Sequence, residues 1–314
     1  PFFLLLLIFP RSFLLQAQAL IMILKLVLAA VFCYGYLTSF KMSKTTRKFC
    51  SLAYAFCGWG WFYLWFFHFQ EVITFLPLML WGIEKIFSKK DARLFIVSCF
   101  LMGCTNYQFF AIFLICSFVY AICKYIKEFF KRGWKNNLLV ISLGFVAFVL
   151  GIGLVSFIIL PNYVFIQQMP RISNTTYLSN LLDAETFMDK LRLIFYWGDN
   201  DSYKHLYPLA GLLYMNTGSF STTLFNGSGY DNAGINLFFY TPLILMIFPS
   251  LFDAIKKKQY SHVIFFVIGV ISVEAPFFYY LSGLFANAYA RYQLFPILMM
   301  ILLVSLHFDS IKKM

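Results

Sequence analysis

Long apolar runs separated by short basic stretches dominate this sequence. The runs cover about 14–40, 49–67, 72–87, 94–123, 138–160, 236–252, 261–281 and 291–308. Most of them reach or approach the roughly 20 residues that a helix needs to cross the hydrocarbon core of a bilayer. The pattern therefore predicts an all-α fold, a polytopic transmembrane helical bundle.

Five dense groups of Lys and Arg flank these runs. They are Lys41/Lys44/Arg47/Lys48, Lys85/Lys89/Lys90/Arg93, Lys124/Lys127/Lys131/Arg132/Lys135, Lys256/Lys257/Lys258 and Lys312/Lys313. Because basic loops are retained in the cytoplasm, we expect all five groups on that side of the membrane. Each apolar stretch between two groups must then cross an even number of times, which gives about nine crossings.

The run 94–123 has a basic group at each end, so it cannot be a single crossing, yet it is short for two full ones. We expect a re-entrant-like hairpin that turns within the polar stretch 105–108. A turn exposed to lipid would leave backbone groups without hydrogen bonds, so it must be buried in protein or line a wet cavity. Asn106 and Tyr107 in this turn are therefore candidate site residues.

Three segments follow from this reading. Residues 1–160 form the N-terminal transmembrane helices, 161–235 form an extracytoplasmic loop region rich in Asn, Ser, Thr, Gly and Tyr, and 236–314 form three C-terminal transmembrane helices. Within the loop region, apolar residues at helical spacing predict a helix over 178–196, with Asn180 or Asp183 as a possible cap.

Composition agrees with a membrane protein and excludes several other classes. With 61% hydrophobic and 12% charged residues and a mean hydropathy of +0.76, the chain cannot cover a soluble globule with polar side chains. The net charge of +12 does not indicate nucleic acid, because 18 of the 25 cations lie in the five basic groups. The seven cysteines show no CxxC spacing, so neither a disulfide framework nor a metal site is predicted, and no cofactor is indicated.

Lys25 is the most unusual charged residue, because it lies deep inside the first apolar run. A cation there costs about 2.5 to 3.5 kcal/mol unless it has a partner or a wet site. Two readings stay open: a structural pair with Glu274, which also lies in an apolar run, or a cation that meets an anionic ligand.

Two further candidates lie at the predicted outer face. Arg291 follows a short external loop and carries a guanidinium that can bind phosphate through two parallel hydrogen bonds, although an interfacial anchor has the same position. Glu71, with His68, lies in a tight external link and could act as a base, a metal ligand or an acceptor for sugar hydroxyls, or could merely be solvated. Together these residues indicate a ligand that is lipid-borne, with an anionic head near the outer interface.

Four segments in order resemble one family. They are LKLVLAAVFCYGYL at 24–37, EVITFLPLMLWGIEKIF at 71–87, TNYQFF at 105–110 and YYLSGLFANAYARYQLFP at 279–296. Their order and spacing resemble the YfhO family of bacterial membrane proteins, which belongs to the GT-C-like polyprenyl-phosphate glycosyltransferases. The similarity extends along nearly the whole chain.

This resemblance implies transfer of a sugar from an undecaprenyl-phosphate carrier to an extracytoplasmic envelope glycan such as teichoic acid, in the bacterial cell membrane. Lys25 and Arg291 would hold the carrier phosphate, Glu71 would lie in the sugar pocket, and Asn106 and Tyr107 would line the turn. In this family we expect the catalytic carboxylate to precede Pro1, and Tyr292 stands where we expect Trp.

Two other functions remain compatible with the residues. A transporter or flippase for a lipid-linked sugar would also need an outer cationic pocket and a buried polar turn, but it should show matching broken helices in two halves. A non-catalytic membrane scaffold would use Lys25 only in a structural pair. All three readings place membrane lipids around the chain.

Overall fold

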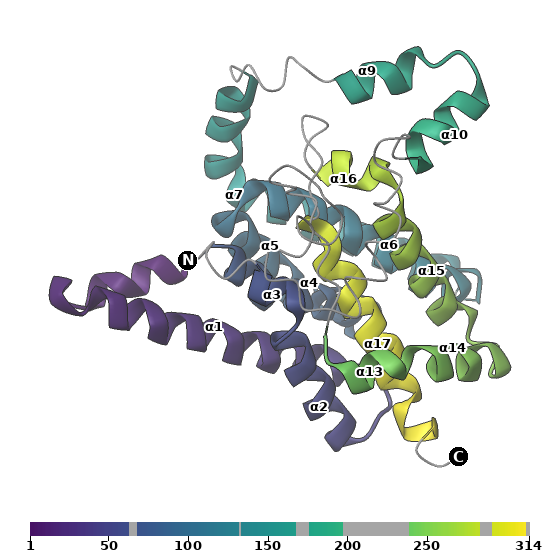
Figure 1. Ribbon diagram of the computed structural model, residues 1–314, viewed down its shortest axis with the longest axis horizontal. Coiled ribbons are helices and arrows are strands. Elements are labelled where there is room, and N and C mark those ends of the chain that lie inside the picture. Colours follow the sequence, from purple (N-terminus) through teal and green to yellow (C-terminus); the bar gives the residue numbers. More distant parts are fainter. Residues whose placement is uncertain (63–67, 132, 168–175, 197–238, 283–290, 312–314) are drawn as a thin grey trace, which may run out of the picture.

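The structure, a computed structural model, describes residues 1–62, 68–131, 133–167, 176–196, 239–282 and 291–311. Within these ranges every regular element is a helix (Figure 1). The α-helices are α1 Leu14–Leu37, α2 Lys44–Ala55, α3 Gly58–Phe62, α4 Phe69–Lys89, α5 Arg93–Thr105, α6 Tyr107–Lys131, α7 Trp134–Gln167, α9 Thr176–Asp183, α10 Phe187–Phe195, α13 Thr241–Leu245, α14 Ile247–Lys256, α15 Tyr260–Glu274, α16 Pro276–Ser282 and α17 Leu294–Ile311. Three short 3₁₀ helices are η1 Phe2–Ile8, η2 Arg11–Phe13 and η4 Arg291–Gln293.

Helix α4 is the centre of the bundle. Every residue from Phe69 to Leu80 is buried, including the polar ones. Helices α1 and α5 pack along it, and α6 also contacts it. A helix that is buried all round belongs to the core of a large assembly of helices rather than to its surface.

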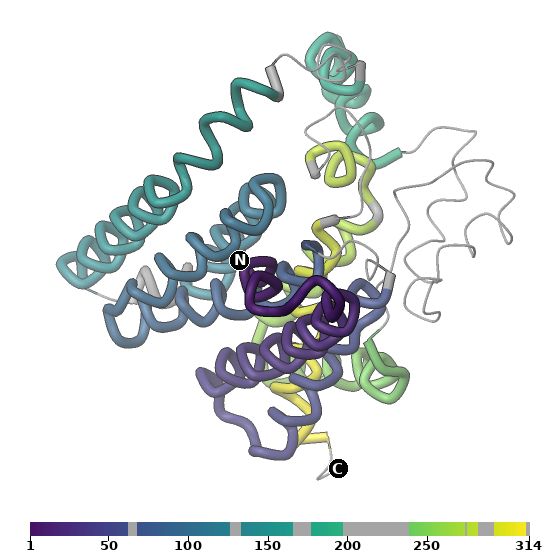
Figure 2. Tube along the Cα trace, turned by 90° about the vertical axis from the view of Figure 1, so that its left-hand side faces the viewer, coloured from purple at the N-terminus to yellow at the C-terminus, as the bar shows by residue number. Residues whose placement is uncertain are grey.

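Other helices carry the lipid-facing surface. The long helix α7 exposes large apolar side chains such as Phe145, Phe157 and Leu160. Figure 2 shows α7 at the edge of the molecule, reaching towards α9. Such continuous exposed apolar surface would aggregate in water, whereas lipid tails cover it without cost.

Length and hydropathy identify four helical stretches that could cross a membrane among the described residues. They are Arg11–Leu37, Tyr107–Tyr125, Trp134–Phe165 and Leu294–Ile311. Two shorter apolar helices, Arg93–Thr105 and Tyr260–Val273, accompany them. The predicted membrane-embedded, all-helical class is thus confirmed at this level.

The predicted turn at 105–108 coincides with a real break between two helices. Asn106 has extended backbone angles, and α5 ends before it while α6 begins after it. Its side-chain oxygen Oδ1 accepts hydrogen bonds from the backbone N–H groups of Gln108 (2.9 Å) and Phe109 (3.2 Å). Asn106 is therefore the N-cap of α6, and it satisfies donors that would otherwise be stranded in an apolar environment.

Contacts along α4 show that α5 and α6 run in opposite directions. At one end of α4, the Thr105 hydroxyl reaches Glu71, and the ring of Phe109 lies 4.6 Å from that of Phe69. At the other end, Tyr120 and Lys124 of α6 both contact Glu84. The segment thus forms a hairpin beside α4.

The basic groups gather at this second end of α4, which we call the basic end. Lys90 bonds Asn136 at the start of α7 (3.3 Å), and Lys257 contacts Ser310 at the end of α17. Asp309 of α17 accepts hydrogen bonds from Ser43 and Thr46 at the start of α2. Four of the five groups therefore share one end, as a single sidedness requires, and Lys312/Lys313 lie outside the described residues.

The turn between α4 and α5 is also at the basic end. Lys90 adopts a left-handed conformation that closes α4, and the Asp91 carboxylate accepts hydrogen bonds from the backbone and side chain of Arg93. These bonds and the guanidinium charge lower the pKa of Asp91 to about 2. The pair is exposed, so it defines the geometry of the turn more than it adds stability.

Small residues let α4 and α5 approach closely. A Cβ added at Gly82 would lie 2.6 Å from the Cα of Phe95, which is backbone and cannot move aside. Close approach through glycine is common where helices associate inside a membrane, because van der Waals packing replaces the hydrophobic effect there.

Four expectations about segment boundaries were wrong. The run 49–67 is no single helix, since α2 ends at Ala55 and α3 begins at Gly58. Pro161 lies inside α7 and does not end it. The run 236–252 is no single descending helix, since α13 and α14 are separated at Met246. The predicted helix 178–196 is likewise divided into α9 and α10, and the cap is Thr186, whose hydroxyl accepts from the Asp189 N–H (3.1 Å).

The sidedness of the basic end can be tested by labelling introduced cysteines in a variant without the native ones. In intact cells, an impermeant maleimide should label Met188→Cys in α10, which is 70% exposed. Lys89→Cys, exposed at the basic end, should react only after the membrane is permeabilised. Labelling of Lys89→Cys in intact cells would overturn the assignment.

The cap at Asn106 predicts a stability difference between two small substitutions. Asn106→Ala should lower the free energy of unfolding by about 1 kcal/mol, because two N–H donors of α6 lose their acceptor. Asn106→Ser keeps a hydroxyl acceptor and should lie close to wild type. Thermal unfolding of the purified protein in detergent measures both, and equal midpoints for Asn106→Ala and wild type would contradict the capping role.

Candidate functional site

The buried cation Lys25 forms an ion pair with Glu71. The Lys25 Nζ lies 3.2 Å from Glu71 Oε1, and both side chains are essentially without solvent exposure. Lys25 lies 12 residues before Leu37, so it is about 18 Å along α1 from the end that meets the basic groups. The pair therefore lies near the middle of α1, well away from those groups.

Register between α1 and α4 creates this pair. The Thr74 hydroxyl donates a hydrogen bond to the backbone carbonyl of Lys25 (3.0 Å), and Gly35 lies against the ring of Trp81 further along. The two helices thus run in the same direction, which brings the middle of α1 beside the first turn of α4. A carboxylate in the first turn of a helix is also stabilised by the helix dipole.

A hydroxyl group also contacts the Glu71 carboxylate. The Thr105 hydroxyl at the end of α5 donates to Oε2 (3.1 Å). Oε1 faces the Lys25 ammonium at 3.2 Å, which occupies at most one of its two lone pairs. This oxygen therefore retains capacity to accept a hydrogen bond from a ligand.

Aromatic rings cover the ammonium of Lys25. The centroids of Phe2 and Phe3 lie 5.5 and 5.8 Å from Nζ, within the range of cation–π attraction. The Phe2 ring in turn stacks on Phe75 of α4 at 5.8 Å. The 3₁₀ helix η1 thus lies over the pair and shields it from the surroundings.

One expectation about this site needs correction. Glu71 does not lie in an external link; it is buried in the first turn of α4, because the Lys25 ammonium gives its charge a partner there. The described partner of Lys25 is this residue, whereas the side chain of Glu274, the partner first considered, lies outside the described residues.

Of the remaining predicted site residues, Asn106 and Tyr107 lie next to the Lys25–Glu71 pair, whereas the side chain of Arg291 is not described. Asn106 and Tyr107 directly follow Thr105, so the helix break adjoins Glu71. Arg291 begins η4, which contacts α6. The position of its side chain lies outside the described residues, so its predicted phosphate contact stays a prediction.

The sequence reading missed Thr105 and Thr74 as polar neighbours of the pair. Thr105 lay within the predicted turn, but a threonine in an apolar helix normally bonds a carbonyl one turn earlier, as Thr105 also does with Leu101 (2.9 Å). No group of three or more His, Cys, Asp or Glu side chains that could hold a metal ion occurs among the described residues. The site offers a cation, a carboxylate and a hydroxyl in an apolar enclosure.

Comparison with families finds one match, to the family described as Bacterial membrane protein YfhO, over residues 1–314. Comparison with curated proteins and with solved structures gives no match. The family identifies a bacterial membrane protein, in agreement with the candidate membrane-spanning helices.

The ion pair predicts strongly non-additive effects of substitution. Lys25→Met should lower the free energy of unfolding by about 3 to 5 kcal/mol, because it leaves a buried carboxylate without a counter-charge. Lys25→Met combined with Glu71→Gln removes both charges and should recover most of that loss. Folded yield and thermal midpoint in detergent measure the cycle.

Lys89→Met is the control, because Lys89 is an exposed cation of the same length. It should leave both quantities unchanged. Additive losses in the double variant would show that Lys25 and Glu71 do not stabilise each other.

Proposed function

We propose that this chain, which belongs to the YfhO family of bacterial membrane proteins, is a GT-C-like glycosyltransferase. It moves a sugar from an undecaprenyl-phosphate carrier to an envelope glycan such as teichoic acid. The observation that carries the proposal is the buried Lys25–Glu71 pair beside the helix break at Asn106. A charged pair in the apolar interior adds little net stability on its own, so it favours a functional role.

Lys25 would bind the carrier phosphate. As the bond between the sugar and the phosphate breaks, negative charge grows on the phosphate oxygens. A fixed ammonium in an enclosure without water stabilises that charge more in the transition state than in the ground state. Because Lys25 is held from above by Phe2 and Phe3 and from the side by Glu71, little reorganisation is needed.

Glu71 would accept a hydrogen bond from a sugar hydroxyl. Its Oε1 has acceptor capacity left, while Thr105 occupies the other oxygen. In the empty site the pair neutralises itself; with donor bound, the phosphate shares Lys25 and the hydroxyl shares Glu71. The pair thus keeps both groups ionised in the absence of substrate.

Asn106 and Tyr107 would line the same space, since they follow Thr105 directly. Arg291 would add a second cation, brought towards α6 by η4. The bundle would make about nine crossings, with 161–235 outside and the segments 1–160 and 236–314 in the membrane. The general base of the reaction is not assigned to a residue of this chain.

Transfer assays on the protein in proteoliposomes test the proposal. Undecaprenyl phosphate carrying radiolabelled glucose or N-acetylglucosamine serves as donor, and purified teichoic acid serves as acceptor. The Lys25→Met/Glu71→Gln double variant, folded but without both charges, should lose turnover by about 100-fold or more, the effect of removing one preorganised electrostatic group. Arg291→Lys should also be slower, because a point charge cannot replace the planar fork.

Two outcomes would contradict the proposal. Wild-type turnover by the folded double variant would leave the pair a purely structural role. Movement of the donor lipid between leaflets without transfer of its sugar, abolished in the double variant, would indicate a transporter. Lys89→Met again serves as the matched control and should retain full turnover.

A further inference from the structure

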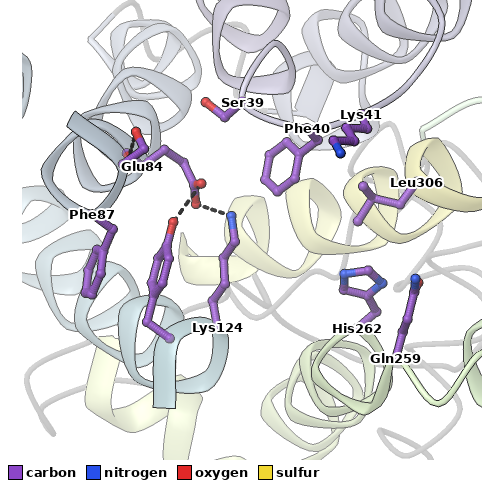
Figure 3. A pocket seen from close by; sticks show the side chains of 11 residues that line it. Ser39, Phe40, Lys41, Glu84, Phe87, Lys124, Gln259, His262 and Leu306 are labelled. Carbon is purple, nitrogen blue, oxygen red and sulfur yellow. Dashed lines mark hydrogen bonds and ion pairs between the residues drawn. The ribbon is translucent and has the colours of Figure 1, made fainter. Parts of the chain in front are cut away.

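A polar cavity lies at the basic end, away from the Lys25–Glu71 pair. Its volume is about 450 Å³, and its wall includes Ser39, Lys41, Glu84, Lys124, Gln259 and His262 (Figure 3). Glu84 and Glu71 are 13 residues apart on α4, so this cavity is about 20 Å from the ion pair. It is therefore a separate site.

One wall of the cavity is a rigid network around Glu84. The Tyr125 hydroxyl donates to its Oε2 (2.8 Å), and both the Tyr120 hydroxyl and the Lys124 ammonium donate to its Oε1. The Tyr36 hydroxyl extends the network by bonding Tyr120 (2.9 Å). The carboxylate is thus fully occupied, and its role is to position Lys124 at the cavity wall.

The balance of charge in the cavity is positive. Lys124 and Lys41 face it from α6 and from the segment after α1, while Glu84 is the carboxylate among the residues that line it. The Lys124 Nζ also lies 4.0 Å from the centroid of the Phe40 ring, which limits its motion. Two ammonium groups around one cavity favour an anion.

On the opposite wall, His262 is the last member of a series of hydrogen-bonded side chains that begins at the buried carboxylate of Asp253. Asp253 Oδ2 lies 2.6 Å from Nδ1 of His307, and Nε2 of His307 lies 3.2 Å from Nδ1 of His262. Asp253 and His307 are buried, and the Lys257 ammonium pairs with the same carboxylate oxygen, Oδ2 (2.6 Å).

These hydrogen bonds determine which nitrogen of His262 is protonated and which can accept a hydrogen bond in the cavity. If Asp253 is ionised and both rings are neutral, Nδ1–H of His307 donates to Asp253 and Nδ1–H of His262 donates to His307. Nε2 of His262 then carries a lone pair. The cavity lined by His262 therefore holds a proton acceptor opposite two ammonium groups.

We propose that this cavity binds a phosphate monoester from the cytoplasmic side of the membrane. Lys41 and Lys124 hold the anionic oxygens, and Nε2 of His262 accepts the hydrogen bond of the remaining P–OH group. A phosphodiester lacks that proton and should bind more weakly. Because the wall also contains Phe40, Phe87 and Leu306, the monoester can belong either to a lipid or to a soluble molecule.

Binding to the purified protein in phosphatidylcholine nanodiscs tests this proposal and distinguishes the two sources. Phosphatidic acid, a lipid monoester, is counted by native mass spectrometry, with phosphatidylglycerol as the diester comparison. Glucose 1-phosphate, a soluble monoester, is titrated by calorimetry. We expect wild type to bind at least one monoester about tenfold more tightly than phosphatidylglycerol.

Variants assign the binding to this cavity. Lys41→Met should weaken monoester binding about tenfold, and His262→Leu should remove the preference for the monoester over the diester. Since Lys124→Met alone would strand Glu84, it is combined with Glu84→Gln. Lys89→Met, an exposed cation at the same end, should bind like wild type.

The proposal fails if wild type binds neither monoester, or if Lys41→Met and the Lys124→Met/Glu84→Gln pair bind like wild type. His262→Phe, which also lacks a hydrogen-bond acceptor, replaces His262→Leu if that variant does not fold. The Lys25→Met/Glu71→Gln variant should keep monoester binding at this cavity even where sugar transfer is lost. Failure at one site is thereby distinguishable from failure at the other.

Discussion

The need to neutralise two buried carboxylates on one central helix determines the arrangement of this protein. Glu71 near the start of α4 takes Lys25 from α1 and Thr105 from α5, while Glu84 near its end takes Lys124, Tyr120 and Tyr125 from α6. An unpaired carboxylate in this apolar interior would be far more expensive than a missing apolar contact. The helices that surround α4 are thus held in register by charge as well as by packing.

Much of the bundle could be predicted because the bilayer restricts what a chain can do. Basic groups at both ends of 94–123 required a hairpin, and the polar residues at 105–108 gave its position. Boundaries were harder where side-chain contacts decide them. Pro161 stays within α7, and the run 236–252 is divided at Met246 into α13 and α14, although its apolar residues are continuous.

The sequence could indicate Lys25 and Glu71 as unusual charged residues, but not that they pair with each other. The free-energy cost of a lysine in an apolar run predicted that Lys25 has a partner or a wet site. Its identity depended on the register of α1 against α4, which the Thr74 hydroxyl helps to fix and which no local pattern reveals. The same holds for the chain from Asp253 through His307 to His262, whose members come from three helices and carry no common spacing.

The low hydropathy of α4 has a consequence for biogenesis. Helix α4 is not among the described stretches that are apolar enough to cross a membrane by themselves, although most of its residues are buried in the structure. A segment with ionised groups enters the bilayer poorly from the translocon when alone. Lys25 is synthesised about 45 residues before Glu71, so α1 is already in the membrane when α4 leaves the ribosome. The Lys25 ammonium can then pair with the Glu71 carboxylate as α4 inserts. Insertion of this protein is thereby a cooperative event in which an early helix acts as the receptor for a later one.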